Sequence, residues 1–173
     1  PDVFFQSREA ANPRYDAVPG IVAEVMAELG GRTGREYHLV DYHGHPEADR
    51  VVVAMGSATG TLREVVDALN ADGQRVGVAT VHLYRPFPAD ALRAVLPATA
   101  SRIAVLDRTK EPGAPAEPLH LDVLAAFAGD SSTLVIGGRY GLGSKEFTPS
   151  DAAAVFAELA LEPLDVAQRG IGR

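Results

Sequence analysis

The chain has 173 residues, of which 46% are hydrophobic and 23% are charged, as in an ordinary globular domain rather than a disordered chain. It has no cysteine, which excludes disulfides, thiolate zinc sites, a cysteine nucleophile and cysteine-ligated iron–sulfur clusters within these residues. The net charge of −7 argues against nucleic acid as a partner, because phosphate binding needs a basic surface. No apolar run approaches the roughly 20 residues that span a bilayer, so we expect no membrane partner and a cytoplasmic location.

The first fifty residues predict an arm that precedes the main domain. Residues 3–5 are Val-Phe-Phe, which favours an extended start. A helix is predicted from about residue 18 to residue 29, and Gly30 and Gly31 are expected to end it. Its apolar stripe consists of Ile21, Val22, Val25, Met26 and Leu29. A short extended piece follows at residues 37–42, and residues 1–49 are therefore predicted to form an N-terminal arm or linker with one helix.

From residue 50 onward, apolar β-rich runs alternate with helical patterns. Strands are predicted at about 51–55, 76–84, 103–107 and 134–137, and helices at about 59–71, 89–96, 119–127 and 149–159. The last helix has the clearest start, with Thr148 as its cap, Pro149 at its first position and Asp151 three residues after the cap. This alternation predicts a three-layer α/β domain over residues 50–173, with a mostly parallel open sheet and helices on both faces.

Two patterns could bind a ligand, but neither has the spacing of an established site. The glycine-containing turn at residues 56–61 leads from a strand into a helix, where backbone N–H groups suit an anion. It matches neither the dinucleotide fingerprint nor the P-loop, so a structural turn is favoured and a ligand or partner contact is the alternative. His43 and His45 lack a third ligand, which favours a solvated pair over a zinc site. We predict no catalytic, cofactor-binding or metal-binding residue.

Two charged loops follow the carboxyl ends of predicted strands, at residues 107–113 and 138–147. This is the edge at which open α/β sheets bind ligands or partners. Glycine and aromatic residues beside the charges favour a packed interface, whereas the alternative is a solvated rim of ion pairs, each worth roughly 0 to 1 kcal/mol. The interface candidates are Arg108, Lys110, Glu111, Arg139, Tyr140, Lys145 and Glu146.

Five blocks of sequence carry a resemblance to a known family. They lie at residues 4–13, 53–57, 83–87, 104–113 and 137–149, and the most specific segments are Arg-Thr-Lys-Glu-Pro-Gly at 108–113 and Gly-Gly-Arg-Tyr-Gly-Leu at 137–142. Over nearly its whole length the chain resembles an internal domain, core domain II, of the pyruvate:ferredoxin (flavodoxin) oxidoreductases. That domain is similar to the C-terminal domain of transketolase-like enzymes.

The resemblance implies a parent enzyme that converts pyruvate and coenzyme A to acetyl-CoA and CO2, passing electrons to ferredoxin or flavodoxin. It implies thiamine diphosphate, Mg²⁺ and [4Fe-4S] clusters in the parent and no cofactor in this chain. The expected partners are neighbouring domains of the parent chain and a second subunit of a homodimer. The chain would then be a non-catalytic structural or interface domain. The alternatives are a free-standing small-molecule or nucleotide-binding module and a subunit-interaction domain of a related 2-oxo acid oxidoreductase.

Overall fold

A computed structural model describes residues 1–161 and contains one five-stranded sheet in the order β1-β3-β2-β4-β5. The strands are β1 (Val40–Gly44), β2 (Arg50–Ala54), β3 (Val76–Val81), β4 (Arg102–Asp107) and β5 (Leu134–Arg139). Neighbouring strands are parallel except at one edge, where β1 runs antiparallel to β3 and Val40 lies opposite Val81. The predicted mostly parallel α/β sheet is confirmed.

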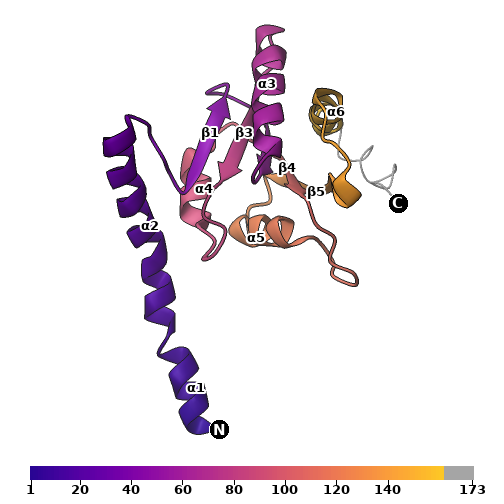
Figure 1. The fold of residues 1–173 in the computed structure, drawn as a ribbon. Helices are drawn as coiled ribbons and strands as arrows, with labels where there is room; N and C mark the ends of the chain where they lie inside the picture. The colour runs from indigo at the N-terminus through magenta and orange to yellow at the C-terminus, as the bar shows by residue number, and fades with distance from the viewer. Residues whose placement is uncertain (162–173) are drawn as a thin grey trace.

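Helices cover both faces of the sheet (Figure 1). One face packs against α3 (Ala58–Ala71) and α6 (Pro149–Leu159), and the other packs against α4 (Ala89–Val95) and α5 (Pro118–Ala126). Because successive strand residues point to opposite faces, Val52 joins the first core cluster and Val51 joins the second. A helix of one turn, η1 (Leu142–Ser144), lies between β5 and α6.

The order of the strands creates a crevice at one edge of the sheet. The chain passes from β2 through α3 to β3 on one side of β2, and then through α4 to β4 on the other side. The loops that leave the carboxyl ends of β2 and β4 therefore run to opposite faces. In open α/β sheets this switch of direction is the usual place for a binding site.

The arm differs from the sequence prediction. It contains two helices, α1 (Asp2–Glu9) and α2 (Asn12–Thr33), where one was expected, and residues 3–5 are helical rather than extended. The helix-forming run at residues 6–11 outweighs the β preference of the three residues before it. Gly30 and Gly31 continue α2, which ends instead at Gly34, the residue that adopts the left-handed conformation with φ +68°.

Part of the predicted arm belongs to the sheet, because β1 lies within residues 1–49 and hydrogen-bonds to β3. The division between residues 49 and 50 stays a prediction, and its last segment, residues 162–173, lies outside the described residues. The start of α6 is confirmed: the Thr148 hydroxyl accepts from the N–H of Asp151, and the Asp151 carboxylate accepts from the N–H of Thr148. Among residues 1–161, no helix has both the length and the apolar character needed to cross a bilayer.

Candidate functional site

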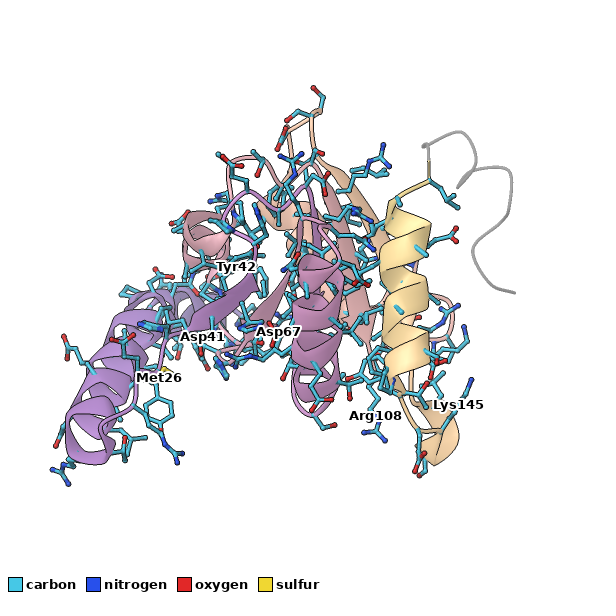
Figure 2. All side chains as sticks on the ribbon, turned by 90° about the horizontal axis from the view of Figure 1, so that it is seen from above. Met26, Asp41, Tyr42, Asp67, Arg108 and Lys145 are labelled. Atoms are coloured by element: carbon cyan, nitrogen blue, oxygen red, sulfur yellow. The ribbon has the colours of Figure 1, made fainter. Side chains whose placement is uncertain are left out.

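The loops after β2, β4 and β5 meet at the carboxyl edge of the sheet, and we call residues 55–57, 108–117 and 140–148 the carboxyl rim. A crevice of about 440 Å³ opens there, lined by the start of α3, by Arg108 and by residues 144–149. It therefore lies at the change of direction between β2 and β4. Figure 2 shows Arg108 and Lys145 at the same edge of the molecule.

Arg108 is exposed and lines this crevice. Its Nε donates to the carbonyl oxygen of Gly141 over 3.3 Å, and a Cβ at Gly141 would lie only 2.9 Å from the same nitrogen. The backbone at Gly141 also has φ +64°, a conformation that side chains other than glycine rarely adopt. The conformation therefore favours glycine at residue 141, whereas the exposed Arg108 side chain could move to make room for a Cβ.

Tyr140 anchors the loop after β5 to the loop after β2. Its hydroxyl donates to the carbonyl oxygen of Met55 over 3.4 Å, and its ring lies 5.0 Å from the ring of Phe147. Burial raises the pKa of Tyr140, with a smaller opposing effect from Arg108. The neutral phenol thus acts as a structural donor, while Lys145 and Glu146 are exposed on the outer part of the loop.

Asp107, the last residue of β4, is buried and holds the start of α5. Its two carboxylate oxygens accept from the N–H groups of Leu119 and His120, over 2.9 and 3.1 Å. These are N–H groups of the first helical turn, which have no partner within the helix. Burial raises the pKa of Asp107, and the two backbone hydrogen bonds oppose that rise. The carboxylate fixes where the loop at residues 108–117 returns to the body.

Glu117 ties the same loop to β5. Its Oε1 accepts from Arg139 Nη1 over 2.5 Å, and its Oε2 accepts from the N–H of Glu111 over 2.7 Å. The hydrogen bond from Arg139 is the main reason that the pKa of Glu117 is lowered. Arg139 is thus engaged within the domain, whereas the exposed Arg108, Lys145 and Glu146 surround the crevice.

Six of the seven predicted interface residues therefore fall into two groups. Arg108, Tyr140, Lys145 and Glu146 lie together at the crevice, and Arg139 and Glu111 are joined through Glu117. Lys110 is exposed on the loop that Glu117 anchors. Sequence reasoning missed Asp107 and Glu117 as anchors. A signal for Glu117 was present, because Pro118 marks a helix start and so places Glu117 at the cap.

The histidines are dispersed. His43 Nε2 lies 2.6 Å from Asp67 Oδ1, and His45 Nδ1 accepts from the N–H of Glu47, so the two rings serve different contacts. Sequence reasoning also missed that His38 and His82 contact opposite oxygens of Asp41, over 2.7 and 2.9 Å. No group of three potential ligands among residues 1–161 has the arrangement of a metal site.

Comparison with known proteins identifies the family. The family model described as pyruvate:ferredoxin oxidoreductase core domain II matches residues 48–152. Curated relatives include a pyruvate:ferredoxin oxidoreductase of Moorella thermoacetica, 57% identical over 161 residues, and a pyruvate-flavodoxin oxidoreductase of Klebsiella pneumoniae, 56% identical over 160 residues. The chain belongs to the pyruvate:ferredoxin oxidoreductase core domain II family. This confirms the resemblance read from the sequence.

Each of these two alignments covers 92% of this chain and 14% of the relative, so the chain spans about one seventh of their length. A solved 2-oxoglutarate:ferredoxin oxidoreductase from Magnetococcus marinus is similar in fold, with a TM-score of 0.54 and 22% identity. That alignment covers 71% of this chain and 20% of the other. The residues matched by the core domain II model include all seven interface candidates, whereas α1, α2 and β1 lie outside it.

Proposed function

We propose that the chain is a non-catalytic interface domain of a longer, thiamine diphosphate- and iron–sulfur-dependent oxidoreductase. The parent would convert pyruvate and coenzyme A to acetyl-CoA and CO2 and pass electrons to ferredoxin or flavodoxin. The observation that carries the proposal is the identity of 56–57% over 92% of the chain to enzymes named for this activity. The domain would hold the neighbouring domains of the parent enzyme in position, because the bond-breaking chemistry in such enzymes belongs to the cofactors.

The residues present do not fit the iron–sulfur clusters or the metal ion of the proposed parent. The chain has no cysteine to ligate an iron–sulfur cluster, and residues 1–161 hold no suitable group of carboxylates and histidines for a metal ion. Thiamine diphosphate, Mg²⁺ and the clusters would accordingly be held by other domains. The contribution of this chain would be mechanical: its carboxyl rim would pack against neighbouring domains or against the second subunit of a homodimer.

The structure sharpens the choice of rim residues for a test. Arg139 is bonded to Glu117, so its replacement would weaken the domain itself as well as any interface. Arg108 and Lys145 are exposed at the crevice, and the 3.3 Å hydrogen bond from Arg108 to Gly141 is weaker than the charged 2.5 Å bond from Arg139 to Glu117, so this pair disturbs the domain less. Arg75 is a matched control, because it is half-exposed and directly precedes β3, at the opposite edge of the sheet.

The experiment compares two variants of the full-length enzyme, Arg108→Gln/Lys145→Gln and Arg75→Gln. We expect the rim variant to lose about tenfold or more in pyruvate-dependent dye reduction, or to dissociate on gel filtration, since tenfold corresponds to about 1.4 kcal/mol of interface energy. The control should keep the wild-type rate. Full activity and intact assembly of the rim variant would refute the interface role. Pyruvate-dependent dye reduction by the pure 173-residue chain would refute the non-catalytic assignment.

A second candidate is a free-standing module that binds a small anion at the crevice. It is favoured by the cavity of about 440 Å³ beside the start of α3 and by the two cations there. Calorimetry of the chain with thiamine diphosphate, coenzyme A and common nucleotides separates the two candidates. Tight binding by the chain alone would support the free-standing module. An absence of binding heat would support the interface domain.

A further inference from the structure

The two helices of the arm bury no residue in this chain, although they are rich in apolar side chains. On α2, Ile21, Val25 and Leu29 are 55%, 59% and 46% exposed, and their spacing of four residues places them on one face. On α1, Phe4 and Phe5 are 71% and 65% exposed. Figure 1 shows both helices running away from the sheet.

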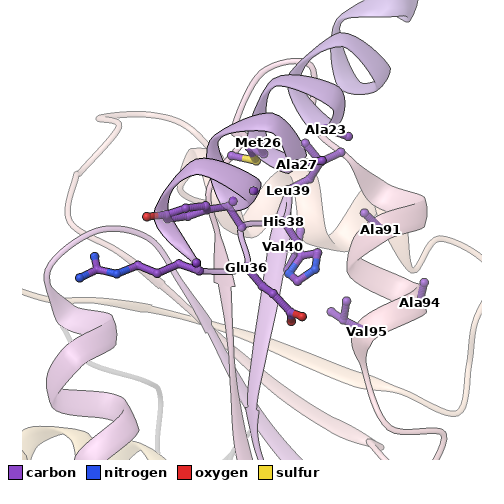
Figure 3. Close-up of a pocket in the computed structure, with 15 residues that line it drawn as sticks. Ala23, Met26, Ala27, Glu36, His38, Leu39, Val40, Ala91, Ala94 and Val95 are labelled. Carbon is purple, nitrogen blue, oxygen red and sulfur yellow. The ribbon is translucent and has the colours of Figure 1, made fainter.

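A second apolar surface lies on the side of α2 that faces the body. A cleft of about 740 Å³ opens between α2, residues 34–40 and α4, with Met26, Val40 and Val95 among its lining residues. Figure 3 shows side chains from α2 and α4 facing this cleft. Apolar surface thus extends from the cleft over α2 to its outer face. We call the cleft and the exposed stripe of α2 the arm surface.

A helix with such an exposed apolar surface is stable only when another surface packs against it, and we call that second surface its cover. Isolated helices are marginal in water, and helices in proteins gain most of their stability by packing an apolar face. Contiguous apolar patches of this kind mark interaction sites. With 22 residues, α2 is roughly 33 Å long at 1.5 Å per residue, which is longer than a small ligand could cover.

The charged residues of the arm argue against a lipid membrane as its cover. Residues 2–33 contain three arginines, no lysine and five acidic residues. Helices that lie on membranes are rich in lysine and arginine, which anionic headgroups attract. Protein is the cover that remains, and the lengths of the relatives indicate its source. The matched region is 14% of those chains, so most of a relative's polypeptide lies outside it.

We propose that the arm surface is an intramolecular docking site, covered by an apolar surface of the same longer polypeptide outside these 173 residues. Attachment to one chain gives such a cover a high effective concentration, so it needs little affinity of its own. Docking there would fix the direction of α2 and hence the position of β1 and the sheet relative to the rest of the enzyme. The inference rests on the proposed function only in requiring a longer polypeptide, and it is independent of the reaction catalysed.

The test compares hydrogen exchange in full-length wild type, in Ile21→Gln/Val25→Gln and in the control Glu24→Gln. Both variants carry the same kind of neutral polar replacement within about one turn of α2, but Glu24 is an exposed charged residue outside the apolar stripe. In wild type and control, we expect amides of residues 21–29 to exchange at least about 100-fold more slowly than an unfolded peptide. The double variant should lose most of this protection and become cleavable by protease within residues 12–33.

Rapid exchange of these amides in full-length wild type would overturn the proposal, as would full protection in the double variant. Protection that disappears when a dimer dissociates on dilution would assign the cover to a second copy and would also overturn it. A full-length protein that is protected here but does not oxidise pyruvate would contradict the proposed function and leave this inference standing.

Discussion

Replacing Asp107 with alanine removes both acceptors that hold the first turn of α5. The N–H of Leu119 is buried, so losing its partner costs about 1–3 kcal/mol, whereas the N–H of His120 is partly buried and water replaces some of its bond. Loss of the buried carboxylate removes a desolvation cost and offsets part of this. We expect a net loss of about 2 kcal/mol in the free energy of unfolding, measured by urea denaturation followed by circular dichroism.

The variant Asp107→Asn is the graded control, because its amide keeps one acceptor oxygen and should lose about half as much. Acidity gives a further check. Burial raises the pKa of Asp107, so the folded state holds this proton more tightly than the unfolded state does. The stability that this tighter proton binding adds is fully present below the ordinary pKa of an aspartate, and it is lost as the pH rises through the pKa of the folded state. The deficit of Asp107→Ala should therefore widen on acidification, and a deficit under about 0.5 kcal/mol that ignores pH would refute this account.

Three further outcomes follow from single contacts. Phe156→Ala, at a side chain that is 1% exposed, should cost about 3–5 kcal/mol in urea denaturation, whereas Leu124→Ala, at a side chain that is 40% exposed, should cost much less. Three hydrogen bonds from Ser132 and Thr133 lower the pKa of Asp130 to about 2, so NMR titration should find its carboxylate ionised at about pH 3. The stability that the ionised carboxylate contributes is present above its ordinary pKa and is lost as the pH falls towards 2. This contribution should disappear in Asp130→Asn. Thr148→Ala should remove about 1 kcal/mol through loss of the α6 cap, and an unchanged denaturation midpoint would contradict it.

The elements from β2 to α6 could be predicted because their local signals and their burial agree. The run at residues 51–54 is fully buried on both faces of a parallel sheet, which is why it appears in the sequence as an unbroken apolar run. The capping residues of α6 lie within four positions of one another, so they can be recognised from the sequence without knowledge of the fold. In the arm, by contrast, no residue of α1 or α2 is buried, so the sequence offered only weak and conflicting local preferences.

The alternation of strands and helices was enough to predict that the charged loops lie at the carboxyl edge of the sheet, but not which partners their charges have. Glu117 meets Arg139 across 22 positions because β5 pairs with β4, and Asp107 meets Leu119 across 12 because α5 packs back on β4. The pairing places Asp107 opposite Arg139 in register, which directs the two following loops to the same edge. Arg139, at the end of β5 beside the rim, is bound to Glu117, while Arg108 and Lys145 are exposed at the crevice. In the interface that we propose, Arg108 and Lys145 are therefore the residues to test first, and substitutions at Arg139 would act mainly through the stability of the domain itself.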